Sequence, residues 1–135
     1  MNVLFFLIPK NNVEYLYDTY TIRQALEKME NHRYSSIPVI SKEGRYIETL
    51  STSDFLWFIK ERNLSIFACE KISIKEIKPY RSDVAIRIDK DVTELIDLIA
   101  NQNFVAVEDD NGIFIGIVTR KAIIDFLRNK IKKID

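Results

Sequence analysis

The chain carries the same stretch of sequence twice, and this internal repeat constrains its fold more than any other feature. Residues 34–54 read YSSIPVISKEGRYIETLSTSD, and residues 102–122 read QNFVAVEDDNGIFIGIVTRKA. At one offset of 68, Gly44 aligns with Gly112 and Ser51 aligns with Thr119. Solenoid repeats have periods of about 20–50 residues, so this longer repeat points away from a solenoid. We expect two copies of a small α/β unit to pair face to face about a pseudo-twofold axis, with two related clefts.

Composition narrows the class of protein. The 135 residues are 47% hydrophobic, which is enough for a sizeable core, and the 20 Lys and Arg balance the 20 Asp and Glu. A balanced charge argues against nucleic acid as a partner, because backbone binding needs a basic surface. The single cysteine, Cys69, cannot form an internal disulfide, so we expect a reducing cytoplasm. The apolar run Val3–Ile8 is too short for a signal peptide or a membrane span, and we expect it to pack into the core.

Each copy has the pattern strand–helix–strand–strand–helix, which predicts a mixed α/β (α+β) fold. Val13, Tyr15 and Tyr17 alternate as in a strand, and Thr21 is a plausible N-cap for the helix that follows. In the first copy we expect a helix over 21–31, strands over 37–40 and 46–50, and a helix over 52–62. In the second we expect a strand near 84–86, helices over 92–99 and 120–134, and strands over 104–107 and 114–118. Repeats assigned to 1–64 and 65–135 are too small to cover both faces of their sheets, so they are expected to share a core.

Three motifs recur in the same order in both copies. They are residues 37–40, 44–46 and 49–54 in the first copy and residues 104–107, 112–114 and 116–121 in the second. This pattern resembles a pair of CBS domains, named after cystathionine β-synthase and often called a Bateman module, from about Pro9 to Lys132. The resemblance implies clefts that bind AMP, ADP, ATP, S-adenosylmethionine or a cyclic dinucleotide. It also implies a regulatory role rather than catalysis.

The first copy matches most of the family motif Gly-apolar-x-Thr/Ser-x-x-Asp. The resemblance implies that its Asp, here Asp54, binds the ribose hydroxyls, and that Ser51 and Ser53 lie near the ribose or phosphate. Adenine would lie against strand backbone of the opposite repeat, at Val105 and Ala106. A Ser-x-x-Asp sequence before an apolar helical stripe is also a helix-capping pattern, and both interpretations stay open.

The second copy departs from the motif. Thr119 is kept, but Ala122 replaces the Asp, and Arg120 and Lys121 stand at the start of the helix. Two cations at the positive end of a helix dipole are mildly unfavourable, and a bound phosphate would relieve this; a solvated basic pair is the alternative. The resemblance pairs this cleft with Tyr15, Ser35, Ser36, Ile37 and Pro38. The second copy also resembles small stand-alone bacterial CBS proteins that bind cyclic di-AMP.

The remaining reactive side chains indicate neither an enzyme nor a metal site. His32 is the only histidine, and it has no Cys or carboxylate at ligand spacing. Cys69 is expected to be a small buried hydrophobe, and Trp57 is expected in the core or in helix packing, with a dimer interface as the alternative. We therefore predict a cytoplasmic regulatory protein without catalytic residues, cofactor or membrane contact. It would sense AMP, ADP or ATP, form a homodimer and signal to an effector protein. A cyclic di-AMP receptor and a partner-binding module without ligand are the alternatives.

Overall fold

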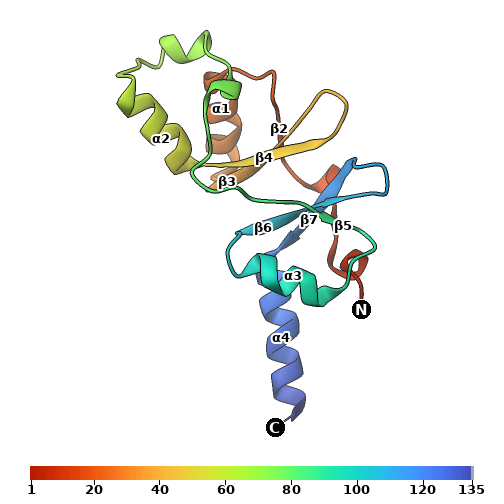
Figure 1. Ribbon diagram of the computed structural model, residues 1–135. Coiled ribbons are helices and arrows are strands. Elements are labelled where there is room, and N and C mark those ends of the chain that lie inside the picture. Colours follow the sequence, from red (N-terminus) through yellow and green to blue (C-terminus); the bar gives the residue numbers. More distant parts are fainter. Residues whose placement is uncertain (135) are drawn as a thin grey trace. The chain divides into compact units, whose positions relative to one another are not determined.

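A computed structural model describes residues 1–134 (Figure 1). It divides into two compact units, each with its own sheet. The repeat-1 unit comprises residues 14–82. The repeat-2 unit comprises residues 1–13 together with the chain from Asp83 onward. The N-terminal segment thus folds with the second copy of the repeat, whereas the first copy keeps residues 65–82, which follow it in the sequence.

The repeat-1 unit has the predicted order of elements: β2 (Leu16–Tyr17), α1 (Ile22–His32), β3 (Ser36–Ile40), β4 (Tyr46–Ser51) and α2 (Thr52–Glu61). Its sheet has the order β2-β3-β4, with β2 parallel to β3 and β3 antiparallel to β4. Helix α1 begins at a capping box in which Thr21 and Gln24 bond each other's backbone N–H groups. The core forms where one face of the sheet meets the two helices; its members include Leu16, Ile37, Val39, Leu50, Ile22, Ala25, Met29, Phe55 and Phe58.

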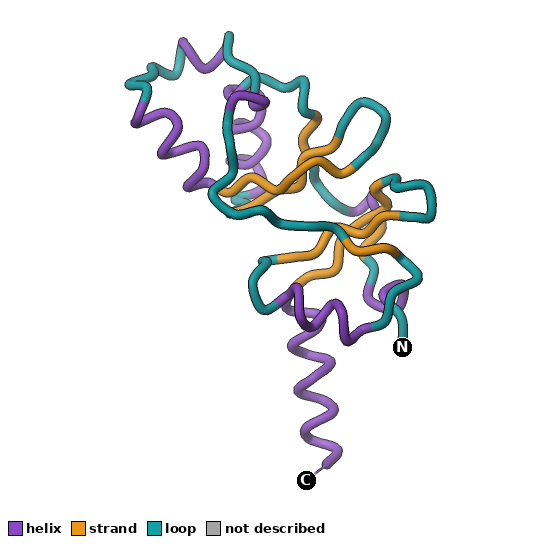
Figure 2. Tube along the Cα trace, viewed as in Figure 1, coloured by secondary structure: helices purple, strands orange, loops and turns teal. Residues whose placement is uncertain are grey.

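The repeat-2 unit contains β1 (Ile8–Pro9), β5 (Ile86–Arg87), α3 (Val92–Ile99), β6 (Phe104–Glu108), β7 (Phe114–Thr119) and α4 (Arg120–Ile134). Its sheet has the order β1-β7-β6-β5. The strands of both sheets are the orange segments in Figure 2. The first copy has no counterpart of β1 within its three-stranded sheet. The core again lies between one sheet face and the helices, and it includes Ile86, Leu95, Val105, Val107, Val118 and Ile123.

The N-terminal apolar run packs only in part as expected. Val3 is fully buried and its N–H donates to the carbonyl of Lys90 at 3.0 Å, in a 3-10 helix over Val3–Phe6. Leu4 and Phe5 of the same turn are more than half exposed. A 3-10 helix has three residues per turn, so a four-residue piece can direct only part of its apolar side chains inward.

The mixed α/β class and the element order are confirmed, whereas the buried faces of two elements, β2 and α2, differ from expectation. In the strand near residues 13–17 the buried residue is Leu16, because its register opposite Val39 directs it into the core, while Tyr15 and Tyr17 lie half-buried. On α2, Trp57 is 52% exposed and Leu56 is 56% exposed, since the helix buries only the face with Phe55 and Phe58. The prediction for Cys69 is confirmed, because its side chain is fully buried and unpaired.

The helices of residues 1–134 include none that combines the length and the apolar character needed to cross a membrane.

Candidate functional site

In the first copy, Ser51 and Asp54 lie where β4 passes into α2. The Ser51 hydroxyl accepts from the Asp54 N–H at 3.2 Å, and Asp54 Oδ2 accepts from the Ser51 N–H at 2.8 Å. The Ser53 hydroxyl bonds the Ser51 hydroxyl at 2.9 Å. The capping interpretation of this motif is therefore confirmed. It does not exclude the ligand role, because a carboxylate oxygen with one hydrogen bond keeps a second lone pair.

The second oxygen of Asp54 is also held by backbone. Asp54 Oδ1 accepts from the N–H of Tyr80 at 3.0 Å, so the carboxylate is fixed between the start of α2 and the segment after Pro79. Sequence reasoning missed this contact. It joins positions 26 residues apart, so no pattern within the motif indicates it.

A second acidic residue, Glu48, stands on β4 three residues before Ser51. Glu48 on β4 is half-buried, and its pKa is raised above the ordinary value by burial and then by the negative charge of Asp54. Both effects disfavour the charged form of Glu48. The first copy thus carries an acidic residue on the strand that leads into α2.

The corresponding corner of the second copy is basic. The Thr119 hydroxyl caps α4 by accepting from the Ala122 N–H at 3.2 Å. The Arg120 guanidinium donates from Nε to the carbonyl of Ile99 at 3.2 Å and from Nη2 to the carbonyl of Gln102 at 2.9 Å. Lys121 is 84% exposed and pairs with Asp125 at 2.8 Å. Arg120 therefore has a structural role at the end of α3, while the ammonium of Lys121 reaches solvent.

The motif glycine explains another difference between the copies. Gly116 has φ +153°, and a Cβ placed there would stand 2.1 Å from the carbonyl oxygen of Ile8 on β1. The close pairing of β1 with β7 therefore requires glycine at this position. At the equivalent position the first copy has Glu48 on β4, which is an edge strand of its sheet.

The other predicted site residues are placed as follows. Ser36 lies opposite Ser51 in the β3–β4 register, and the Ser35 carbonyl accepts from the Thr52 N–H at 2.9 Å. Ile37 and Pro38 continue β3 beside them. Tyr15 packs edge-to-face on Tyr17 with ring centroids 5.5 Å apart, and its pKa is raised chiefly by its hydrogen bond with Tyr17. Val105 and Ala106 are buried in β6 of the repeat-2 unit.

The repeat-1 unit thus gathers Ser35, Ser36, Ser51 and Asp54 at one corner, where β3, β4 and α2 meet. Thr119, Arg120 and Lys121 gather at the equivalent corner of the repeat-2 unit. Their role in ligand binding stays a prediction, as does the pairing of each set with residues of the other repeat.

Comparison with known proteins agrees with the repeat. The family model of the CBS domain matches twice, at residues 7–61 and 74–129. The chain belongs to the CBS domain family. Both matches include the motif corners described above.

One curated relative is the "Magnesium and cobalt efflux protein CorC" of Buchnera aphidicola, which is 27% identical over 129 residues. The match covers 93% of this chain and 43% of that protein, so the chain spans less than half of its relative.

Two solved CBS structures are similar over nearly the whole chain. A CBS domain protein from Streptococcus pneumoniae is 28% identical, with a TM-score of 0.84, over 95% of this chain and 87% of that one. CbpB in complex with c-di-AMP is 24% identical, with a TM-score of 0.85, over 99% of this chain and 89% of that one. The CBS-pair fold predicted from the sequence is confirmed.

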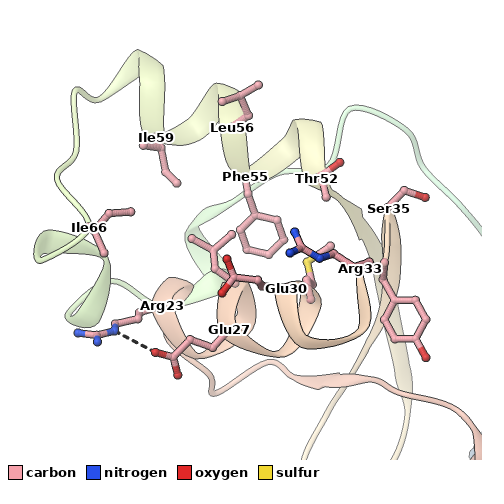
Figure 3. A pocket seen from close by; sticks show the side chains of 13 residues that line it. Arg23, Glu27, Glu30, Arg33, Ser35, Thr52, Phe55, Leu56, Ile59 and Ile66 are labelled. Atoms are coloured by element: carbon pink, nitrogen blue, oxygen red, sulfur yellow. Dashed lines mark hydrogen bonds and ion pairs between the residues drawn. The ribbon is translucent and has the colours of Figure 1, made fainter.

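The first CBS repeat also has a pocket between α1 and α2 that sequence reasoning missed (Figure 3). It measures ≈ 730 Å³, and the Phe55 ring lies between the two helices. Leu56, Ile59 and Ile66 add apolar surface, and Arg23, Glu27, Glu30 and Arg33 add charges of both signs. The signal available in the sequence was that α2 carries more apolar residues than a single buried face can hold.

Gln102 is a second residue that sequence reasoning missed. The residue is 5% exposed; its side-chain Nε2 donates to the Val84 carbonyl at 3.0 Å, and Oε1 accepts from the Val84 N–H at 2.9 Å. This side chain ties the segment before β5 to the start of β6. No sequence signal separates such a buried amide from a solvated one.

His32 contacts two neighbouring side chains. Its Nε2 lies 3.3 Å from Glu14, and its ring stacks on Tyr34. Over residues 1–134, the structure brings together no group of three His, Cys, Asp or Glu side chains that would hold a metal ion.

Proposed function

We propose that this CBS-pair protein binds an adenine nucleotide of the AMP, ADP or ATP type and regulates a protein partner rather than catalysing a reaction. The observation that carries the proposal is the Asp54 carboxylate, which two backbone N–H groups fix at 2.8 and 3.0 Å beside the start of α2. A preorganised carboxylate is suited to a ribose diol, because each oxygen can accept one hydroxyl in addition to its backbone bond.

The regulatory half of the proposal follows from population shift. A ligand alters partner binding only if it binds one conformation or one assembly better than another. The family membership supports a sensor of this kind, and the effector protein is identified only as one whose affinity changes with ligand. We expect this role to be performed in a reducing cytoplasm.

A specific observation favours cyclic di-AMP as a second candidate ligand. Thr119, Arg120 and Lys121 stand at the start of α4, where backbone N–H groups and the helix dipole favour anions, and no carboxylate occupies position 122. CbpB, which has the same fold, was solved in complex with c-di-AMP. A ligand with two phosphates would use the exposed ammonium of Lys121.

Isothermal titration and thermal unfolding with AMP, ADP, ATP and cyclic di-AMP test the proposal. A ligand at 100 times its Kd adds about 2.7 kcal/mol of stability, which raises Tm by several degrees for a chain of this size. If the AMP-type nucleotides bind, Asp54→Ala is expected to weaken them at least tenfold. Asp91→Ala is the matched control, because Asp91 caps α3 through the Thr93 N–H. Either cap loss costs about 0.5–2 kcal/mol of stability.

The same titrations also test cyclic di-AMP, the second candidate ligand. Cyclic di-AMP binding is expected to fall at least fivefold in Lys121→Ala and to change little in Lys132→Ala, which removes an exposed charge farther along α4. Absence of binding by every compound would contradict both sensor proposals and favour the partner-binding module without ligand.

The assembly proposed is a homodimer that uses the pocket between α1 and α2 of the first repeat. Leu56 and Ile66 there are 56% and 63% exposed, and two Arg and two Glu surround them. In a twofold-symmetric dimer the same surface patch of the two copies meets itself. A patch that carries both Arg and Glu can therefore place the cations of one copy beside the carboxylates of the other. We therefore assign a second copy of this chain as the occupant of the pocket.

A further inference from the structure

The last two turns of α4 stand clear of the rest of the repeat-2 unit. Ile123 is fully buried and Leu127 packs against the core, whereas every residue from 128 to 134 is exposed. Figure 1 shows this end of α4 extending away from the sheet of its own unit. Short helical segments without tertiary packing are marginal in water, so a partner that packs against these turns would stabilise them.

The exposed part of α4 carries a narrow apolar stripe. Its members follow one another at spacings of three, four and three residues, and they are Ile124, Leu127, Ile131 and Ile134. These are the a and d positions of two heptads. The three isoleucines are 49%, 61% and 84% exposed, in chain order. A stripe confined to a and d is narrower than the face with which a helix covers a protein core, and it is the geometry of a seam between two helices.

Cations flank the stripe on both sides. Arg128 and Lys130 occupy its e and g positions. The helix contains six Lys or Arg and a single acidic residue, Asp125, which already pairs with Lys121 at 2.8 Å and with Arg128 at 2.6 Å. Lys130 lies over the Phe126 ring, with Nζ 5.5 Å from the ring centroid. The flanks of the stripe therefore keep a net positive charge.

This charge disfavours a second copy of α4 as the occupant of the stripe. Two α4 helices side by side would bring flanks of like charge together, which costs free energy. A helix with carboxylates beside its own apolar seam would turn the same interaction into an attraction, and it would also steer the encounter between the two proteins. Charge and seam geometry thus specify the same kind of partner.

We infer that the apolar stripe of α4 is a docking surface for an amphipathic helix of a partner protein that carries Glu or Asp beside its apolar seam. The inference rests on the proposed function in one respect, because it takes this partner to be the regulated effector. The stripe shares no residue with the pocket proposed for the homodimer or with the two motif corners. Docking, dimerisation and nucleotide binding can therefore be separated by mutation.

Fluorescence anisotropy with two labelled peptides tests the inference on the full chain. Both peptides have three heptads with Ile at a and Leu at d; one carries Glu at every e and g position, and the other carries Lys. The acidic peptide is expected to bind about tenfold more tightly than the basic one, and its affinity should fall as salt rises.

Three variants locate the docking surface. Ile131→Asp should weaken the acidic peptide by about tenfold, because it places a carboxylate in the seam. Lys130→Glu should weaken the acidic peptide and tighten the basic one, each by about threefold. Ile47→Asp is the matched control, since it alters an isoleucine of β4 that is 44% exposed, and it should leave both affinities within about twofold. Thermal unfolding of each variant shows whether a changed affinity reflects the stripe or a damaged fold.

Equal affinity for the two peptides, or equal losses in Ile131→Asp and Ile47→Asp, would overturn the docking surface. So would phosphatidylserine vesicles that bind through Ile131 when the acidic peptide does not, or a halved mass of Ile131→Asp in light scattering, which would assign the stripe to lipid or to a second copy. Nucleotide titrations on the same variants keep the two proposals apart. Nucleotide binding without peptide docking overturns the docking surface alone, and peptide docking without nucleotide binding overturns the proposed function alone.

Discussion

At the scale of single residues, the raised pKa of Glu48 makes the stability of the fold depend on pH. Burial and the charge of Asp54 raise its pKa in the folded protein above the ordinary value of 4.5. The unfolded chain therefore releases this proton at lower pH than the folded chain. Stability falls as pH rises from 4.5 to the raised pKa, and above that pKa the penalty is complete.

Glu48→Gln is accordingly expected to stabilise the protein near pH 8, by less than about 1 kcal/mol because the side chain is only half-buried. The gain should shrink as pH falls and vanish below pH 4.5. Urea unfolding between pH 8 and pH 4 measures it, with Glu43→Gln as the control of equal charge. A gain in stability that stays constant from pH 8 to pH 4 would contradict a raised pKa for Glu48.

At the scale of elements, the pairing of β1 with β7 joins segments more than 100 residues apart in the chain. Ile8 lies opposite Ile117 and Pro9 lies opposite Gly116. Gly116→Ala would place a Cβ 2.1 Å from the Ile8 carbonyl oxygen, so β1 must move away. We expect a loss of about 1–3 kcal/mol, measured as a lower urea midpoint. Glu48→Ala, at the equivalent position of an edge strand, should cost less than 1 kcal/mol. Equal losses in both variants would mean that the close approach of β1 is not what requires glycine.

At the scale of the whole molecule, the proposed homodimer uses the pocket between α1 and α2 of the first repeat. Light scattering after size exclusion is expected to give twice the mass of the chain. Leu56 is 56% exposed in a single copy, and the proposed dimer would bury it. Leu56→Asp should therefore shift the protein to the monomer, because burying the unpaired carboxylate costs free energy. Ile131→Asp, on a 61% exposed residue of α4 outside the pocket, is the matched control. A monomer for the natural chain, or dimers for both variants, would rule out this interface.

Local chemistry allowed much of the molecule to be predicted from its sequence. Thr21 and Ser51 begin their helices as expected, since a capping box needs only groups three residues apart. The hairpin strands follow from apolar runs flanking Gly44 and Gly112, whose φ values of 88° and 78° suit turns. The family motif marked Ser51 and Asp54 as candidate site residues for the same reason, because all its members are neighbours in sequence.

Contacts between segments that lie far apart in the sequence were decided by the tertiary structure alone. The Tyr80 N–H on Asp54, the carbonyls of Ile99 and Gln102 on Arg120, and the β1 backbone against Gly116 each join positions at least 18 residues apart. The register of Leu16 against Val39 likewise settled which side of β2 is buried. Periodicity and capping are set by interactions within about one helical turn, whereas these contacts exist only after the sheets and helices have packed.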